Sequence, residues 1–497
     1  MRDAIAVLAF AMLGLTASPS AIRQNDSTSC NLYNTGTNEM RQGNSAAAIQ
    51  TFGRVIEGCL QVDVQATAWL QIGRIRLSQW PVDLAGARTA AERLTGSPYL
   101  NTPSAADGFI LKGLVELADG RNFANAITEF KRVDRNVTRL TTAMAEAQYR
   151  IGEAQRLNHQ TEAALRTFQD VTLAYPRTAW AAQALLSAAA CQTRLGDFRE
   201  AMESLQRVRR DFPGAPETDA ALQRNTILYR LYLKGTSQDL VPVMASRKKY
   251  QNGLALAMDR QGRILLGHRD GLAVLHEESG DEVDAAALTG NTAFGVTDVG
   301  TWGNIAALAR EHLIVRHMAN LPPMRPVSPK ADGVADEVEV LSFTVNWRGE
   351  WLIGDGKTNT LRKYTSDGTP AGVLPGRMKA ERMARNDIDD VAVLDGDRKV
   401  VWILGRDGAV AGQIAKRGAE KEYDFGSPVD VKFDVLGNVY VLDGDKNSIF
   451  VFDPRLRFRT LLNLPPKVIR KPVAFAVDAR GHIYVFDRDA QQVFGYQ

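Results

Sequence analysis

Asp443-Gly-Asp445-Lys-Asn447 carries three oxygen-bearing side chains at alternate positions, which is how a calcium-binding loop begins. Such a loop also needs Gly at its sixth position and Glu at its twelfth, and these places hold Ser448 and Pro454. The flanking VYVL and IFVF segments favour strands, whereas a helix–loop–helix site needs helices. We therefore interpret Asp443 as a turn residue, because an Asp side chain can accept a hydrogen bond from the backbone just ahead of it.

Signatures of other enzyme chemistry are sparse. The six His form no HExxH pair, and no nucleophile elbow, phosphate loop or dinucleotide fingerprint stands out. Cys191 has no assignable His partner, so we interpret it as a small packing residue. The sequence therefore predicts no catalytic residue, no metal ligand and no cofactor.

The N-terminus has the pattern of a secretory signal peptide. Met1-Arg2 precedes the apolar run AIAVLAFAMLGL, which is followed by small residues. This run is too short to span a bilayer comfortably, so we expect residues 1–21 to be removed and no transmembrane segment to remain. Ser27-Thr28-Ser29 precede Cys30 where a lipobox would need a Leu-like residue. We expect a periplasmic or secreted protein that is not a lipoprotein.

Composition and charge bound the function classes. The chain has 497 residues, of which 45% are hydrophobic and 24% charged, as in globular proteins of two or three domains. The net charge of +3 is nearly balanced, and together with the signal peptide it argues against a nucleic-acid partner.

Residues 30–235 show a helical repeat. A shift of 37 residues places Ala164 on Ala201 and Phe168 on Leu205, and earlier units follow at 38 or 39. A small residue that would let two helices approach recurs in the first helix of four units, at Gly36, Gly73, Gly152 and Ala189. The pattern predicts five stacked helical hairpins with a capping helix at about 216–233.

This spacing resembles the tetratricopeptide repeat (TPR) family, and residues 143–214 also look like the repeats of bacterial envelope proteins. The resemblance implies a concave groove, lined by the first helix of each unit, that holds a protein partner. The alternative is an ordinary surface without a partner. The family's groove positions fall on Tyr33, Glu146, Tyr149, Glu153, Arg156 and Gln183.

Two cysteines mark the first hairpin. Cys30 starts its first helix and Cys59 ends its second, and these ends are neighbours in an antiparallel hairpin. Because the signal peptide directs the chain to an oxidising compartment, we expect a Cys30–Cys59 disulfide.

The apolar pattern changes from helical to alternating at about residue 240. Six units of about 44 residues, with roughly four short strands each, predict a six-bladed β-propeller over 240–497. Divergent units at 294–308 and 390–404 complete the count. Four better copies align on a shared Gly: LAMDRQGRILLG (256–267), TVNWRGEWLIGD (344–355), KFDVLGNVYVLD (432–443) and AVDARGHIYVFD (476–487).

The units GNVYVLDGDKNSIFVFD and GHIYVFDRDAQQVFGYQ resemble NHL-type repeats. The last unit offers only three strands before the chain ends. Since a propeller must close to hide its strand edges, we expect its fourth strand to come from residues 240–250.

One face of this propeller should carry the turns between second and third strands together with the loops between blades. Long loops on a rigid scaffold commonly bind ligands, but a solvated rim of mixed charge is the competing interpretation. The candidate residues on this face are Asp336, Glu339, Asp355, Arg382, Asp387, Asp443 and Asp487.

The sequence thus predicts a multidomain α plus all-β protein, in which a TPR-like α-solenoid precedes a six-bladed propeller. The presumed inner strands, such as 254–258 and 473–477, are apolar, so no set of convergent metal ligands can be assembled. We expect a non-enzymatic scaffold of the cell envelope that binds protein or glycan. The alternative is a lactonase-like hydrolase or lyase with a helical targeting domain.

Overall fold

The structure is a computed structural model that describes part of the chain. The predicted signal peptide and Asp336 lie outside the described residues. Described are residues 28–497, except 80–81, 135–139, 235–239, 260, 288–297, 303–304, 311–312, 319–337, 347, 366–367 and 416–422.

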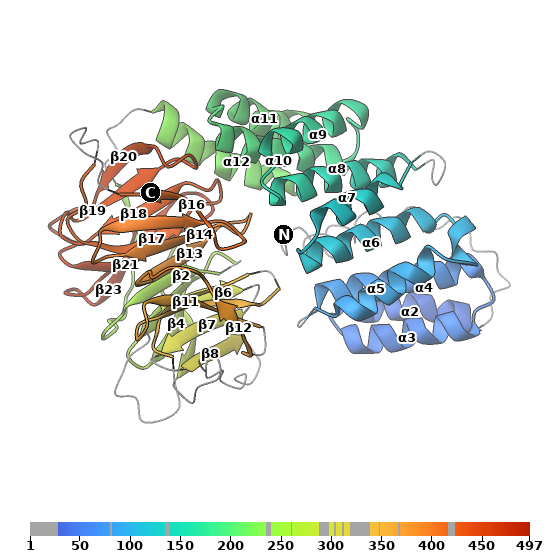
Figure 1. The fold of residues 1–497 in the computed structure, drawn as a ribbon, viewed down its shortest axis with the longest axis horizontal. Helices are drawn as coiled ribbons and strands as arrows, with labels where there is room; N and C mark the ends of the chain where they lie inside the picture. The colour runs from blue at the N-terminus through green and yellow to red at the C-terminus, as the bar shows by residue number, and fades with distance from the viewer. Residues whose placement is uncertain are drawn as a thin grey trace. The chain divides into compact units, whose positions relative to one another are not determined.

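Helices that run in antiparallel pairs fill residues 28–233 (Figure 1). The helical region predicted from the repeat pattern is confirmed. Its helices are α2 (Thr28–Arg41), α3 (Ser45–Gly58), α4 (Val62–Ser78), α5 (Leu84–Leu94), α6 (Ala105–Asp119), α7 (Phe123–Lys131), α8 (Thr141–Leu157), α9 (Thr161–Ala174), α10 (Ala179–Leu195), α11 (Phe198–Asp211) and α12 (Glu217–Leu228), with a 3-10 turn η1 (Tyr99–Asn101) and a π-helical turn η2 (Tyr229–Leu233).

Small residues let the helices of a pair approach each other. A Cβ atom added at Gly152 would lie 2.5 Å from the ring of Phe168, which is completely buried. The same relation holds at Gly113, where the added atom would lie 2.3 Å from Phe130. Interiors are packed too tightly to absorb such an overlap. The repeated small residue therefore seats the large residue of the following helix, as the sequence pattern predicts.

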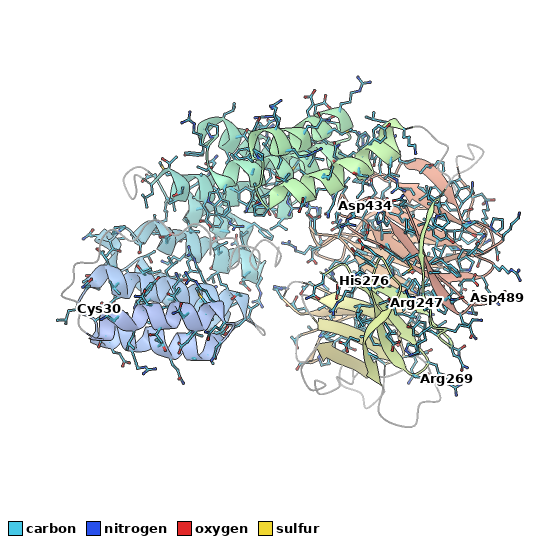
Figure 2. All side chains as sticks on the ribbon, turned by 180° about the vertical axis from the view of Figure 1, so that it is seen from behind. Cys30, Arg247, Arg269, His276, Asp434 and Asp489 are labelled. Atoms are coloured by element: carbon cyan, nitrogen blue, oxygen red, sulfur yellow. A yellow bond between two sulfur atoms is a disulfide. The ribbon has the colours of Figure 1, made fainter. Side chains whose placement is uncertain are left out.

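The first hairpin carries a covalent link. Cys30 lies in α2 and Cys59 directly follows α3, and their sulfur atoms are bonded with the Cα atoms 4.7 Å apart. Both residues are buried beside Phe52 and Ile72 in the core of this hairpin and the next helix. Figure 2 labels Cys30 within the helical region.

Contacts divide the chain into two compact units. One consists of Met1–Cys191 with Arg207–Thr218, and the other of Gln192–Gln206 with Asp219–Gln497. The second unit therefore begins before residue 240, where the alternating pattern starts. It contains the segments around α12 and η2 as well as the whole propeller.

Contacts of Tyr232 with Arg459 and Asn438 explain why η2 groups with the propeller. Within the second unit, the ring of Tyr232 stacks on Phe198 with centroids 3.7 Å apart, and the guanidinium of Arg459 lies 5.0 Å from each ring. The Tyr232 hydroxyl also hydrogen-bonds the side-chain oxygen of Asn438. Leu231 packs on the same buried cluster as Tyr440.

Antiparallel sheets make up the propeller (Figure 1). Four of them each contain four strands that follow one another in sequence. The first two sheets are β2 (Ala255–Met258), β3 (Ile264–His268), β4 (Gly271–Leu275) and β5 (Glu282–Ala287), then β9 (Val340–Val345), β10 (Trp351–Asp355), β11 (Thr360–Tyr364) and β12 (Pro370–Val373). The next two are β13 (Arg382–Arg385), β14 (Val391–Asp395), β15 (Val400–Leu404) and β16 (Val410–Ile414), then β17 (Pro428–Phe433), β18 (Val439–Asp443), β19 (Ser448–Phe452) and β20 (Phe458–Asn463).

The number of complete blades differs from the expected six. Five sheets have four strands, whereas the sheet of β6 (Asp298–Trp302), β7 (Ile305–Arg310) and β8 (Leu313–Met318) has three within the described residues. The first strands of neighbouring sheets contact one another around the axis. The β6–β8 segment is the weakest copy of the repeat, because its sequence Trp302-Gly-Asn-Ile305 lacks the Asp/Asn-x-x-Gly spacing found at 259–262, 346–349, 434–437 and 478–481. A β-propeller is confirmed, and a count of six blades is not.

The fifth complete blade joins both ends of the domain. Its order is β1 (Pro242–Ala245), β23 (Gln492–Tyr496), β22 (Ile483–Asp487) and β21 (Pro472–Val477). Pro242 pairs with Tyr496, and Ala245 pairs with Phe494. The expectation that residues 240–250 supply the missing strand is confirmed.

Replacing residues 240–250 by a Gly/Ser linker of equal length should prevent the propeller from folding. The change removes β1 and the buried side chains of Met244 and Tyr250, so we expect a loss of more than about 4 kcal/mol in unfolding free energy. Thermal unfolding followed by circular dichroism measures it. A control that changes only the exposed Arg247 and Lys249 to Ser should melt like the wild type. A folded monomer that lacks β1 would contradict the closure argument.

Candidate functional site

The expected groove centres on aromatic side chains of α8 and α10. Tyr149 is buried, with its ring 5.3 Å from Trp180 and 5.5 Å from Phe168. The Arg150 guanidinium lies 5.0 Å from the Trp180 ring and 5.4 Å from the Tyr149 ring, so it is held by both π faces. Its Nε and Nη2 donate no hydrogen bond within the described part of the chain. Tyr149, Arg150 and Trp180 are 5%, 1% and 6% exposed, so the cluster packs α8 against α10 and offers a partner no surface of its own.

Two further groove candidates form an ion pair beside this cluster. Arg156 donates from Nε and Nη2 to the two carboxylate oxygens of Glu153, at 3.2 and 3.3 Å. Ser187 on α10 donates to the same carboxylate at 3.2 Å. Burial opposes ionisation of Glu153, but the charge and hydrogen bonds of Arg156 outweigh it and hold the pKa below its ordinary value. Glu153 is therefore a fixed negative charge between α8 and α10.

Glu146 has the opposite protonation behaviour. Its side chain is buried one turn before Arg150, with its Oε1 3.8 Å from the arginine Nε. Burial raises the pKa of Glu146 from 4.5 to about 7, although Arg150 and Arg74 partly offset the effect. Arg74 on α4 in turn lies 3.8 Å from Asp107 on α6. The first helices of three successive hairpins thus contribute charges to one network.

The two remaining groove candidates lie apart from this network. Gln183 is half-buried on α10, close in sequence to Ser187. Tyr33 is half-buried on α2, where its ring packs 5.5 Å from Phe52 and its hydroxyl accepts a hydrogen bond from Gln71 at 3.4 Å. Tyr33 therefore belongs to the first hairpin's packing, and the contacts do not bring it to Tyr149.

On the propeller, the repeated aspartates are bound to backbone amides. Asp443 is fully buried and accepts hydrogen bonds from the N–H groups of Gly426, Ser427 and Lys446 at 2.6, 3.0 and 3.0 Å. The fourth residue after it, Asn447, has a left-handed backbone with φ of 49°. The side chain thereby ties its own turn to the loop from the preceding blade. These bonds occupy both carboxylate oxygens, as expected for a turn residue.

The equivalent positions repeat this arrangement. Asp487 is fully buried and accepts from the N–H groups of Arg470, Lys471 and Ala490 at 2.7, 2.6 and 2.8 Å. Asp355 accepts from Thr358 Oγ1 at 2.7 Å and from Arg362 Nε at 2.9 Å. None of these three candidate face residues presents a free carboxylate.

The other described face candidates are scattered. Glu339 is exposed beside Gly356 in the turn after β10, as expected. Arg382, at the start of β13, donates to the carbonyl oxygen of Leu254 at 3.0 Å and so reaches from one inner strand toward the blade that begins with β2. Asp387 is exposed in the turn between β13 and β14.

The position of Asp387 corrects the sequence interpretation. Residues 387–390 were expected on the same face as Asp443, but a first-to-second-strand turn opens on the opposite face. The reason is a substitution in the repeat: Asp389 occupies the left-handed turn position, with φ of 75°, that Gly437 holds in the next blade at 83°. Without the marker glycine, the sequence carries no signal that a strand, β13, precedes this turn.

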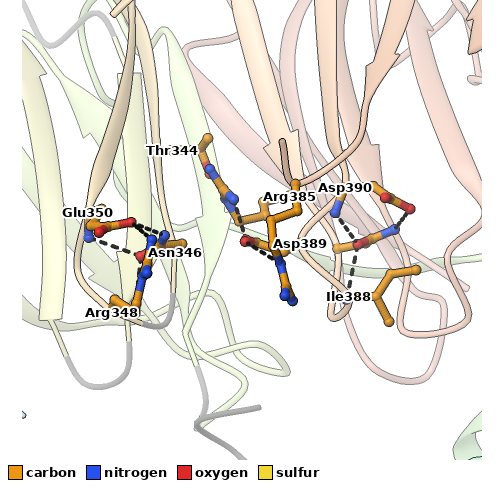
Figure 3. Close-up of polar contacts among 10 residues, drawn as sticks. Thr344, Asn346, Arg348, Glu350, Arg385, Ile388, Asp389 and Asp390 are labelled. Carbon is orange, nitrogen blue, oxygen red and sulfur yellow. Dashed lines mark hydrogen bonds and ion pairs between the residues drawn. The ribbon is translucent and has the colours of Figure 1, made fainter. Parts of the chain in front are cut away.

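This turn belongs to a charged network that sequence reasoning missed. Arg385 donates to Thr344 Oγ1 at 3.3 Å and pairs with Asp389, as Figure 3 shows. The Asp389 carboxylate also lies 3.7 Å from Arg406 Nε. Burial lowers the pKa of Arg406 to about 10, with the charge of Asp389 opposing the shift. The Arg385–Thr344 hydrogen bond links the β9 and β13 blades, whereas the two charge pairs lie within the β13 blade.

Polar groups on an inner strand were also missed. Asp430 on β17 is fully buried, and its Oδ1 accepts a hydrogen bond from Lys432 Nζ at 3.0 Å. Its Oδ2 accepts from the backbone N–H of Phe475 on β21 at 3.0 Å. The signal that could have found it is the Asp at an otherwise apolar inner-strand position of PVDVKF.

Metal-binding clusters and membrane-spanning helices are absent from the described ranges. Within them, no three His, Cys, Asp or Glu side chains are placed to hold a metal ion together. Among the helices the structure describes, none combines the length and hydrophobicity needed to cross a membrane.

Asp443→Ala should lower the unfolding free energy by about 2–4 kcal/mol, because three backbone N–H groups lose their acceptor. The exposed neighbour Asp445→Ala should change it by less than about 0.5 kcal/mol. Chemical denaturation measures both. Added calcium should leave the melting temperature unchanged, and a calcium-dependent rise that Asp443→Ala abolishes would restore the metal-site interpretation.

Glu146→Gln should change how stability depends on pH. Since the folded-state pKa lies above the unfolded value, this carboxyl contributes stability below pH 4.5 that is lost as pH rises through about 7. The variant should match the wild type near pH 4.5 and exceed its unfolding free energy by about 2–3 kcal/mol near pH 8. Denaturation at both pH values tests this. Glu162→Gln, at an exposed position, serves as the control. The prediction is refuted if the unfolding free energies of Glu146→Gln and wild type differ by the same amount at both pH values.

Comparisons with known proteins give one family match and several similar solved structures. Residues 146–178 and 183–215 match the tetratricopeptide repeat family. No curated protein matches the chain. The propeller is similar to the WD40 domain of Neurospora crassa Pan2 (12% identity, 53% of this chain and 96% of that chain, TM-score 0.39) and to a streptogramin B lyase (7%, 52% and 97%, 0.41). It is also similar to regucalcin, a calcium-binding protein from Agrobacterium tumefaciens (13%, 50% and 90%, 0.38).

Proposed function

We propose that the protein is a non-enzymatic scaffold outside the cytoplasm, in which the helical groove holds a protein partner and the propeller presents a second binding surface for protein or glycan. The observation that carries the proposal is the match of residues 146–178 and 183–215 to the tetratricopeptide repeat, in which the buried cluster of Tyr149, Arg150 and Trp180 holds α8 against α10. Stacked repeats of this kind form the concave surfaces that repeat proteins use for binding.

The location in the cell envelope forms part of the proposal. The basic, apolar and small-residue pattern of the N-terminus supports it, and so does the bonded pair Cys30–Cys59, because disulfides persist in oxidising compartments. We also propose that the β6–β8 sheet is the sixth blade of the ring, supported by the contacts of β6 with β2 and β9.

A propeller hydrolase or lyase is the second candidate. Asp430 and Lys432 on an inner strand favour it, because polar groups near the axis could act on a small substrate. The geometry supports the scaffold better, because both oxygens of Asp430 already accept hydrogen bonds from within the propeller. A stoichiometric divalent metal in the purified protein would favour the hydrolase instead.

Photocrosslinking in intact cells tests the scaffold. A photoreactive amino acid at the half-buried Gln183, beside the aromatic cluster, should capture a defined partner. The same amino acid at the exposed Arg166 on α9 should not. Recovery of the protein as a free monomer from both positions would rule against the groove as a binding site.

A further inference from the structure

Exposed cations gather on one edge of the propeller, between two neighbouring second-to-third-strand turns. Lys446 lies in the turn after β18, and Arg488 lies in the turn after β22. Three more cations lie in the connection between these blades, after β20. We call this set the basic ridge; it consists of Lys446, Lys467, Arg470, Lys471 and Arg488, all exposed.

Backbone and buried side-chain bonds hold the ridge together as a fixed surface. Asn447 Nδ2 donates to the carbonyl oxygens of Leu464 and Ile469, at 3.3 and 3.0 Å, which seats the connection on the first turn. The backbone N–H of Arg488 donates to the carbonyl oxygen of Lys471 at 2.9 Å, which joins the connection to the second turn. Asp487 clamps the same junction through the N–H groups of Arg470 and Lys471. The cations are thus displayed from ordered backbone.

The charge of the ridge is largely uncompensated. No ion pair involves Lys467, Arg470, Lys471 or Arg488 in the described part of the chain, and the Lys446 amine donates to the backbone oxygen of Asp424. Asp443 and Asp487 lie beneath the ridge, but their carboxylates are buried and bound to backbone amides. The exposed acids in the same turns are Asp445 and Asp489, the latter labelled in Figure 2. The five cations and two exposed acids together carry a net charge of +3, which is as large as the net charge of the whole chain.

An apolar tip accompanies the cations. Val468 is 43% exposed between Lys467 and Arg470, and the exposed Pro466 precedes them. Cations around an exposed aliphatic side chain fit a surface whose headgroups are anionic and whose interior is apolar. Single-stranded nucleic acid would instead require exposed rings for stacking, and the described residues of these segments expose none.

We propose that the basic ridge binds the phosphate headgroups of an anionic phospholipid membrane, so that the propeller lies against the bilayer with blades β17–β20 and β21–β23 toward it. The attraction is the sum of several exposed charges near a negative surface, with Val468 entering the headgroup layer. The inference rests on the ridge alone and does not depend on the groove binding a partner.

Co-sedimentation of the full chain with vesicles tests the proposal. The protein should bind vesicles of phosphatidylcholine with a quarter phosphatidylglycerol and should bind pure phosphatidylcholine much less. About 0.5 M salt should release it, since exposed charges are then screened. The triple variant Lys467→Gln, Lys471→Gln, Arg488→Gln should bind anionic vesicles about 100-fold more weakly, since each basic residue contributes about fivefold. The wild type and the triple variant share the apolar run at residues 4–15, so any contribution of this run to vesicle binding is the same in both.

Two matched variants separate charge from folding. Arg166→Gln, Arg177→Gln, Arg209→Gln removes the same charge from exposed positions of the helical region and should bind like the wild type. Lys467→Arg, Lys471→Arg, Arg488→Lys keeps the ridge charge and should also bind. Equal binding of the neutralised ridge variant, equal binding to neutral vesicles, or binding of inorganic phosphate or polyglutamate without vesicle binding would each overturn the proposal.

Discussion

The propeller depends on one strand pairing. An open ring of sheets would leave unpaired backbone groups at each end, and β1 removes both ends by adding itself to β23. Ser246 continues this pairing, because its hydroxyl accepts a hydrogen bond from the N–H of Val493, 247 residues away in sequence. Met244 and Tyr250 then fill the core between this blade and the β2–β5 blade. The turns that carry the basic ridge keep their positions only while this closure holds.

Buried aspartates fix the turns of the propeller to the loops between its blades. Each one uses its charge to satisfy the amides of its own turn and of the loop that arrives from the preceding blade, as Asp443 and Asp487 do. Because both carboxylates are turned inward, they do not offset the exposed lysines and arginines nearby, and Asp445 and Asp489 remain as the exposed acids of these turns. The hydrogen bonds that Asp443 and Asp487 make to backbone amides thus leave the surface of these turns more positive. Asp443 belongs to the sequence motif that resembled a metal site.

Much of the architecture could be predicted from local patterns. The helix pairs follow from small residues that seat large ones, such as Gly152 under Phe168, and the closing strand follows from counting strands in the last blade. The turn of the β13 blade could not be placed, because Asp389 adopts the left-handed conformation that Gly signals elsewhere. The Arg385–Thr344 and Asp430–Phe475 hydrogen bonds depend on contacts between blades, which no repeat period encodes. The grouping of Tyr232 with the propeller likewise depends on its contacts with Asn438 and Arg459.

Closure by distant segments also sets an order of events during synthesis. Helical hairpins are built from neighbours in sequence and have what they need to fold as the chain emerges. The propeller cannot complete its last blade until the residues of β23 have emerged, so β1 waits as an unpaired edge through the synthesis of all the other blades. That waiting edge is the segment most in need of protection during synthesis, and the helical region that precedes it in sequence has fully emerged by then.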